Sequence, residues 1–187
     1  GTVGKRTPQA GFKIAGVYAN GTTSSDYGGG ICQVSSTLYN AVLKANLDIV
    51  NRVNHMFTVG YVPIGLDATV SLGAPDFKFK NSRKYPIKLV AKTSNKKLYI
   101  SVYGCKEDVE YDVELISYKT GTVKYSTVYT TDSSLAKGKT KVVQAGSNGS
   151  TSVAYKVLKL NGKEVSRTLL SKDTYSPHNQ IIARGTK

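Results

Sequence analysis

One segment of this 187-residue chain has the apolar spacing of an α-helix, and three consecutive glycines lead directly into it. Apolar residues recur at steps of three and four between Ile31 and Ala45, and Asn46 is a suitable stop. The predicted buried face of this helix consists of Ile31, Val34, Leu38, Ala41, Val42 and Ala45. Elsewhere apolar and polar residues alternate, as is typical of β-strands. The sequence therefore predicts one helix in a chain that is otherwise made of strands.

The strand-like segments fall into two sets of different composition. The first set consists of residues 48–53, 57–62, 68–70, 77–80, 87–90 and 98–102. In the second set Thr, Ser, Tyr and Val dominate, and Asn161-Gly162 is the signature of a tight hairpin. We therefore predict an α+β domain over residues 1–105, with one main helix packed on an antiparallel sheet, and a small, elongated all-β module over residues 106–187. Each part has its own apolar residues, so we expect each to fold alone.

The chain is strongly basic, with 26 Lys and Arg residues against 12 Asp and Glu and a net charge of +14. Such a charge favours a polyanionic neighbour, and nucleic acid, an anionic membrane surface and a teichoic-acid-rich wall all qualify. The basic residues are scattered at strand-like spacing, so we predict no nucleic-acid partner. No apolar run approaches the roughly 20 residues that cross a bilayer. The sequence begins at Gly1 without an apolar leader, so we expect any targeting segment or membrane anchor to lie outside it.

The first turn of the predicted helix contains Cys32, one of two cysteines in the chain. Gly28, Gly29 and Gly30 allow backbone conformations that other residues resist and leave space for a ligand. Free N–H groups and the positive end of the helix dipole stabilise a thiolate there and supply an oxyanion hole. Cys32 lies off the predicted apolar face, which favours a nucleophile over a thiol that only fills space. The second cysteine, Cys105, lies at the junction of the two parts, and we assign it no function.

A thiol nucleophile needs a base, and the chain has two histidines. His55 lies in the same predicted domain as Cys32, whereas His178 belongs to the all-β module. Asp67 is the first choice for the group that orients the imidazole, and Asp76 is the second. The predicted substrate and oxyanion contacts are Gly29, Gly30, Gln33, Ser35 and Tyr61. The residues alone leave a structural role open, because buried cysteines and single histidines usually only pack.

A long motif around Cys32 resembles the VanW domain family. It consists of GGGICQVSSTLYNA at 28–41, Asn54-His55, Tyr61-Val62-Pro63, Gly65, Asp67-Ala68-Thr69-Val70 and Asp76-Phe77-Lys78-Phe79-Lys80-Asn81. The resemblance extends over about residues 11–104. Some clostridial members of that family are L,D-transpeptidases that use this cysteine, so the resemblance implies that Cys32 is a nucleophile. The roles of His55 and Asp67 follow from chemistry and position instead.

The second part of the chain resembles the G-five module of Gram-positive surface proteins. The matching residues are Gly138-Lys139-Thr140, Gly146, Asn161-Gly162-Lys163-Glu164-Val165, Ser171 and Ile181-Ile182-Ala183-Arg184-Gly185-Thr186-Lys187. The resemblance implies that this module binds polymers containing N-acetylglucosamine, and the basic charge of the chain makes teichoic acid a further candidate. A plain spacer is the alternative, because a fold alone does not assign a function.

Together these features predict a cysteine acyltransferase outside the cytoplasm, in the wall or on the surface of a Gram-positive bacterium. The expected reaction is L,D-transpeptidation of peptidoglycan stem peptides. Cys32 attacks the third residue of a tetrapeptide and releases D-Ala, and the thioester passes to an amine of a second stem to give a 3-3 cross-link. No metal or cofactor is predicted. A hydrolase of the L,D-carboxypeptidase type would use the same residues, and a non-catalytic wall-binding scaffold is the other alternative.

Overall fold

The computed structural model describes residues 2, 4–19 and 22–187. The first half contains helix α1 (Ile31–Lys44) and strands β1 (Ile14–Ala19), β2 (Thr22–Tyr27), β3 (Asp48–Asn51), β4 (Lys78–Lys80), β5 (Lys88–Ser94) and β6 (Lys97–Tyr103). The second half contains strands β7 (Asp112–Val123), β8 (Thr127–Asp132), β9 (Thr140–Gln144), β10 (Gly149–Leu160), β11 (Lys163–Tyr175) and β12 (Gln180–Gly185). The described residues therefore form an α+β fold with a single α-helix near its start.

Helix α1 begins and ends where the sequence predicts. It follows Gly30 and stops before Asn46, whose φ of 54° is left-handed and cannot continue the helix. Its buried face consists of Ser35, Ser36, Tyr39, Val42 and Leu43. The predicted face was wrong in part, since Val34 is 44% exposed. The buried face begins with the polar residues Ser35 and Ser36, so a search for apolar spacing could not identify it.

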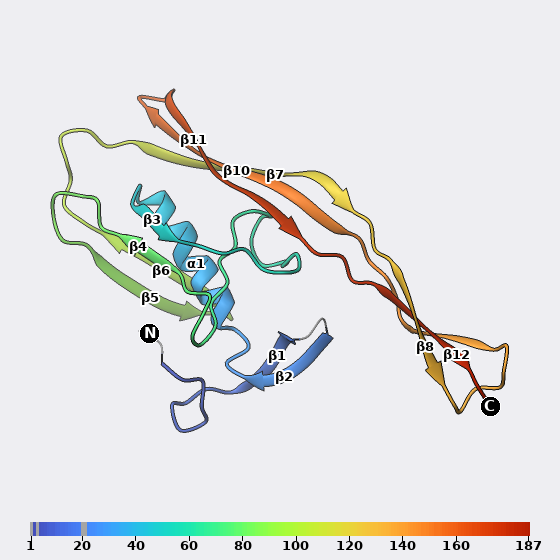
Figure 1. Ribbon diagram of the computed structural model, residues 1–187. Coiled ribbons are helices and arrows are strands. Elements are labelled where there is room, and N and C mark those ends of the chain that lie inside the picture. Colours follow the sequence, from blue (N-terminus) through green and yellow to red (C-terminus); the bar gives the residue numbers. More distant parts are fainter. Residues whose placement is uncertain (1, 3, 20–21) are drawn as a thin grey trace.

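The strands of the first half form three separate antiparallel pairs, β1-β2, β3-β4 and β5-β6, instead of one sheet. Segments 57–62 and 68–70, predicted as strands, are loops. They form no continuous ladder of backbone hydrogen bonds. An isolated bond joins the Thr69 N–H to the Val53 carbonyl oxygen at 2.8 Å. The helix contacts β3, β6 and β7, so it lies between the first-half strands and the long strands of the second half (Figure 1). The predicted packing of a helix on antiparallel strands is thus present, but the second half supplies part of the surface.

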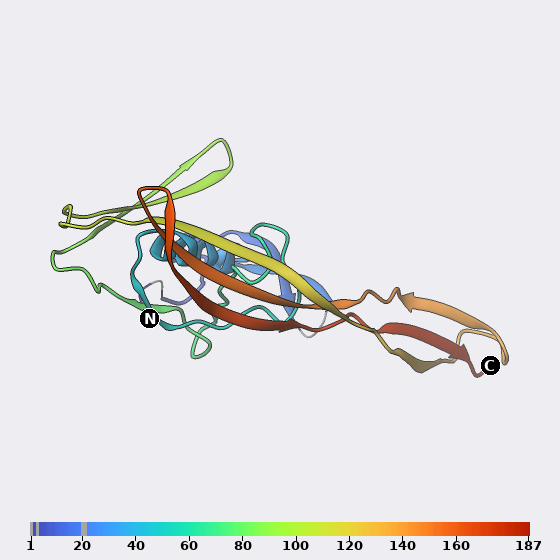
Figure 2. The same ribbon diagram turned by 90° about the horizontal axis from the view of Figure 1, so that it is seen from above.

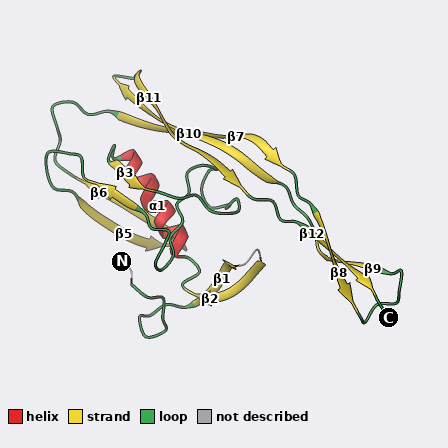
Figure 3. Ribbon diagram, in the orientation of Figure 1, coloured by secondary structure: helices red, strands yellow, loops and turns green. Residues whose placement is uncertain are grey.

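The second half forms two three-stranded sheets in a row, β11-β10-β7 close to the helix and β8-β12-β9 beyond it (Figure 3). Asn161 and Gly162 join β10 to β11 with positive φ values of 52° and 77°, as a type I′ turn requires. This hairpin and the all-β character of the second half are confirmed. Viewed from above, the long sheet lies across the helix, and the second sheet extends away from it toward the C-terminus (Figure 2).

The apolar core lies between the two halves of the chain. Its buried cluster consists of Tyr39, Leu43, Leu66, Ala68 and Ala154. The partly buried residues packed against this cluster are Ile49, Phe77, Leu115 and Leu170. Strands β7, β10 and β11 each contribute a residue, so the second half completes the core that the helix begins. This shared core argues against the expectation that each half folds alone, which stays a prediction to be tested.

Candidate active site

The backbone enters α1 through two glycines that leave no room for side chains. Gly28 has a φ of +72°, and a Cβ there would lie 2.9 Å from the side chain of Arg6. A Cβ on Gly29 would lie 2.3 Å from the carbonyl oxygen of Gly16 in β1. Gly29 therefore packs against β1, which favours a structural role over the predicted substrate contact. Gly30 is exposed at the helix start.

The amide of Cys32 is the donor that the first turn of α1 offers to a ligand. The N–H of Ile31 bonds to the carbonyl oxygen of Gly28, and that of Gln33 to the carbonyl oxygen of Gly30, both at 3.1 Å. The N–H of Cys32 has no acceptor in the part of the chain that the structure describes. The oxyanion hole expected from several helix amides is therefore reduced to the amide of Cys32 in this turn.

The Cys32 thiol is half-buried at the helix start. It lies one turn before the buried serines of α1, so the prediction that it lies off the buried face was wrong. Its Sγ is 3.4 Å from the carbonyl oxygen of Val70, to which the protonated thiol donates. Burial raises the pKa of the thiol, but the neighbouring imidazole of His55 and the charge of Arg6 outweigh burial and lower the pKa of Cys32. A thiolate is thus favoured relative to an ordinary cysteine.

Ser35 and Ser36 fix the loop around Asp67 to the helix start. The Ser35 Oγ donates to the carbonyl oxygen of Ala68 at 2.6 Å, and the Ala68 N–H donates to the Ser36 Oγ at 3.0 Å. The Ser36 hydroxyl donates to the carbonyl oxygen of Cys32 at 2.7 Å, and the single proton of the Ser35 hydroxyl is shared with that oxygen at 3.0 Å. Ser35 is only 7% exposed. The substrate contact predicted for Ser35 does not fit this position, which favours a structural role.

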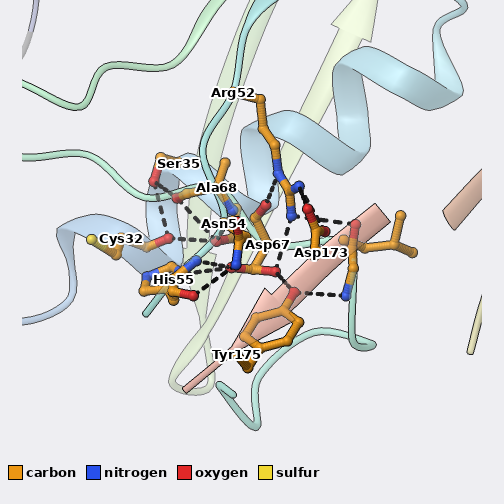
Figure 4. A network of polar contacts seen from close by, with 12 residues as sticks. Cys32, Ser35, Arg52, Asn54, His55, Asp67, Ala68, Asp173 and Tyr175 are labelled. Atoms are coloured by element: carbon orange, nitrogen blue, oxygen red, sulfur yellow. Dashed lines mark hydrogen bonds and ion pairs between the residues drawn. The ribbon is translucent and has the colours of Figure 1, made fainter. Parts of the chain in front are cut away.

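The imidazole of His55 is held by the carboxylate of Asp67 (Figure 4). Asp67 Oδ2 is 2.6 Å from Nδ1 of His55 and accepts the backbone N–H of the same histidine at 2.7 Å. Burial lowers the pKa of His55, but its hydrogen bond with Asp67 and the nearby charges of Asp67 and Cys32 outweigh this effect and raise the pKa to about 9. The imidazole is therefore protonated at neutral pH, beside a thiol whose pKa is lowered. The pair favours thiolate and imidazolium.

Asp67, the first choice from the sequence, is the carboxylate that contacts His55, and it is only 1% exposed. Burial raises the pKa of Asp67, but hydrogen bonds from His55 and Tyr175 outweigh it and lower the pKa below its usual range. Asp76 Oδ1 instead accepts the N–H of its neighbour Phe77 at 2.9 Å. The structure thus brings the predicted cysteine, histidine and aspartate together, and their catalytic roles stay a prediction.

Tyr61 lies on the exposed side of His55. Its Oη is 3.2 Å from Nε2 of the imidazole, and the two rings meet edge to face. Burial raises the pKa of Tyr61 to about 12, so the hydroxyl stays protonated and can donate. Its side chain is 40% exposed, and Gln33 in the first turn of α1 is exposed as well. Both side chains are open to a ligand.

Three further residues surround Asp67 that the sequence did not single out: Arg52, Asp173 and Tyr175 (Figure 4). Arg52 donates to the carbonyl oxygen of Asp67 at 2.6 Å and to its Oδ1 at 3.1 Å. It also bonds both carboxylate oxygens of Asp173 at 2.7 Å. Tyr175 donates to Asp67 Oδ1 at 2.5 Å. Asp173 and Tyr175 lie 121 and 108 residues from their partners, so no local spacing could have found them.

An α+β domain with a cysteine, a histidine and an aspartate at the start of its helix, joined to an extended all-β domain, defines the class of protein. The chain belongs to the VanW family: the model described as VanW like protein matches residues 1–103. The model of the G5 domain matches residues 116–187. The two resemblances stated from the sequence are thereby confirmed, and the matches by themselves assign no activity.

Known proteins resemble each half of the chain. Uncharacterized protein YoaR of Bacillus subtilis (strain 168) is 50% identical over 102 residues, which are 54% of this chain and 34% of that protein. The chain thus spans about a third of the length of that relative. A solved G5 domain of an IgA1 protease is 27% identical with a TM-score of 0.32, covering 42% of this chain and 92% of that one. The crystal structure of HP0197-G5 is 23% identical with a TM-score of 0.25, covering 41% and 100%.

The VanW and G5 domains together indicate an extracellular, cell-wall-associated protein. Among the described residues, no helix has the length and apolar character needed to cross a membrane. Across the same residues, no three His, Cys, Asp or Glu side chains gather in a way that would hold a metal ion.

Proposed function

We propose that this chain is a cysteine acyltransferase of the cell wall, an L,D-transpeptidase that acts on peptidoglycan stem peptides. The observation that carries the proposal is a cysteine at the start of α1 whose thiol pKa is lowered by the neighbouring His55, with the ring of that histidine fixed by the buried Asp67. Cysteine nucleophiles use this arrangement for acyl transfer. The VanW and G5 domains, which indicate a wall-associated protein, support peptidoglycan as the substrate.

The first half-reaction forms a thioester. The Cys32 thiolate attacks the carbonyl carbon of the third residue of a tetrapeptide stem, and the carbonyl oxygen becomes an oxyanion. The N–H of Cys32 and the hydroxyl of Tyr61 are the donors available to that oxyanion. The peptide bond then breaks, the imidazolium of His55 gives its proton to the departing amine of D-Ala, and the acyl group remains on Sγ.

The second half-reaction resolves the thioester. The neutral imidazole of His55 takes a proton from a side-chain amine of a second stem, meso-diaminopimelate, as this amine attacks the thioester carbonyl. The Cys32 thiolate leaves and a 3-3 cross-link forms, so thiolate and imidazolium are both restored. If water attacks instead of the amine, the product is a free tripeptide and the enzyme is an L,D-carboxypeptidase.

The G5 domain is proposed to hold the enzyme at its polymeric substrate. The net charge of +14 suits the anionic polymers of a Gram-positive wall, such as teichoic acid, and a glycan is the second candidate ligand. A wall-binding scaffold without catalysis would use the same contacts. The two functions differ in one measurable respect, because only the transferase forms a covalent intermediate.

Intact-mass spectrometry after incubation of the full chain with a stem tetrapeptide tests the proposal. We expect a mass increase equal to the tripeptide acyl group, located on Cys32 by peptide mapping. A tripeptide stem, which lacks the D-Ala leaving group, is the control and leaves the mass unchanged. An acceptor stem added afterwards distinguishes cross-linked product from hydrolysed tripeptide. A folded protein that forms no adduct with the tetrapeptide would contradict the proposal and favour the scaffold.

His55→Ala is expected to slow acylation by on the order of 100-fold or more. The substitution removes both the cation beside the thiolate and the acid that protonates the leaving amine. The other histidine provides a matched control: His178 lies in the second half, stacked on Phe57, so His178→Ala should preserve the rate. The time course of adduct formation gives both rates. Equal rates in the two variants would exclude His55 as the acid and base.

The pH profile of acylation is expected to be bell-shaped, with its alkaline limb near pH 9. The rate rises with pH as the Cys32 thiol ionises at its lowered pKa. It falls above the His55 pKa of about 9, because the imidazolium that protonates the leaving group is then lost. Measurement of kcat/KM from about pH 5 to about pH 11 shows both limbs. A rate that keeps rising beyond the alkaline limb would mean that the imidazolium is not required.

A further inference from the structure

We infer that the G5 domain is part of the proposed active site, and that Tyr175 is a positioning residue whose hydroxyl sets how strongly Asp67 holds the His55 imidazole. The inference rests on the proposed function, because it concerns the same site. The VanW match ends at residue 103, whereas Tyr175 ends strand β11 inside the G5 match at residues 116–187. The site is thus completed by a residue from the domain otherwise assigned to wall binding.

Tyr175 is enclosed at the contact between the two domains, with 0% of the residue exposed. Its hydroxyl donates to Asp67 Oδ1 at 2.5 Å and accepts the N–H of Gly65 at 2.9 Å. One donated and one accepted bond fix the direction of this hydroxyl. The other oxygen of the same carboxylate, Oδ2, contacts the backbone N–H and Nδ1 of His55. A single carboxylate therefore links Tyr175 to the imidazole.

The chain on both sides of His55 is bonded to the residues that flank Tyr175. The side-chain amide of Asn54 donates to the carbonyl oxygen of Thr174 at 3.0 Å. The carbonyl oxygen of Met56 accepts the N–H of Ser176 at 2.7 Å. The backbone that carries the imidazole is thus braced on β11 and the residue that follows it.

The charges behind Asp67 also come from both domains. Arg52 lies between Asp67 of the VanW domain and Asp173 of β11, and the three side chains are 7%, 1% and 7% exposed. Water therefore screens these charges poorly. Asp173 partly neutralises the positive charge of Arg52. The negative charge of Asp67 therefore acts more strongly on the imidazole of His55. The titratable and charged groups on the thiol side of the imidazole are Cys32, Tyr61 and Arg6.

A carboxylate that shares its charge with a tyrosine hydroxyl attracts an imidazolium less strongly than an unshared one. Tyr175 therefore moderates the attraction between Asp67 and His55 and also fixes the direction of the carboxylate. The hydroxyl can do so only when β11 is packed on the VanW domain. Packing of the G5 domain on the VanW domain is thus coupled to the contact between Asp67 and His55.

The test is Tyr175→Phe in the full chain, with the pKa of His55 measured by NMR titration of the imidazole protons. The chain has two histidines. His178 of the G5 domain stacks on Phe57 of the VanW domain, so its ring reports whether the two domains are still packed together. We expect the pKa of His55 to rise above its wild-type value, because Asp67 no longer shares its charge, while the chemical shifts of the His178 ring protons stay unchanged. Acylation by the tetrapeptide should slow by about tenfold, the effect of one lost bond to a charged group.

Two further variants separate positioning from a loss of stability. Tyr118→Phe changes a 51% exposed tyrosine of β7 in the same sheet and should alter neither measurement. Tyr175→3,5-difluorotyrosine keeps the bond and strengthens the donor, so the pKa of His55 should fall, even if the phenylalanine variant does not fold. A wild-type titration of His55 in the difluorotyrosine protein overturns the inference. Because titration needs no substrate, that result is distinct from failure of the proposed function, which is a wild-type protein without an acyl adduct.

Discussion

Cys32→Ala is expected to abolish both the covalent adduct with a stem tetrapeptide and the formation of cross-links, a loss of roughly 10⁴-fold or more. No neighbouring group can replace the thiolate. Tyr61 stays protonated because its pKa is about 12, and the hydroxyls of Ser35 and Ser36 are buried and bonded. The fold should survive, because the thiol makes only a weak bond to the carbonyl oxygen of Val70, worth less than about 1 kcal/mol. Intact mass and circular dichroism measure the two effects.

The second cysteine is the matched control for this prediction. Cys105 is exposed and free, so Cys105→Ala should leave adduct formation unchanged. Alkylation by iodoacetamide gives an independent measure, since Cys32 should react at a pH well below about 8.5. Alkylation of Cys32 that follows a model thiol across the whole pH range would favour a structural cysteine. Adduct on a Cys32→Ala protein would overturn the nucleophile assignment outright.

A chain that ends at residue 105 is expected to lose the fold and the site together. Without residues 106–187, the buried side chains of Tyr39, Leu43 and Leu66 lose the strands that complete their core. Each large apolar side chain returned to water costs roughly 1.5–3 kcal/mol. Three of them represent a large share of the roughly 5–15 kcal/mol that stabilises an ordinary domain. The short chain should therefore show no cooperative thermal transition, and Cys32 should alkylate like a free thiol.

The matched control for the truncation ends at residue 179, just before β12 (Gln180–Gly185). It removes the central strand of the distal sheet but keeps β7, β10 and β11, and with them Tyr175. We expect this protein to retain a cooperative transition and the enhanced alkylation of Cys32. If the chain of residues 1–105 melts cooperatively and forms the acyl adduct as fast as the full chain, the shared core is not needed.

Several elements were predictable because their causes lie within a few residues. The limits of α1 follow from the glycines before it and from Asn46, whose backbone cannot continue a helix. The β10–β11 hairpin follows from Asn161-Gly162, since these residues readily adopt positive φ. Strands β5 and β6 likewise follow from alternation on either side of a turn.

Part of the candidate site was also accessible from the sequence. Cys32 was selected by its place after a glycine run, and His55 by being the histidine of the same domain. Asp67 was selected with Asp76 as the alternative, and only the structure shows that Asp67 is the one in contact with His55. A choice between two carboxylates depends on where loops fold, which a spacing pattern does not contain.

The amino-acid sequence by itself thus determined where the helix starts and stops, where the long hairpin turns, and which residue types can form a thiol site. Only the tertiary structure decided that Ser35 and Ser36 lie on the buried face, because their hydroxyls bond to Cys32 and Ala68. It also decided that Tyr175 bonds to Asp67 from 108 residues away. Local propensities reach only a few residues along the chain, whereas a buried polar group takes whichever partner the packed chain brings to it.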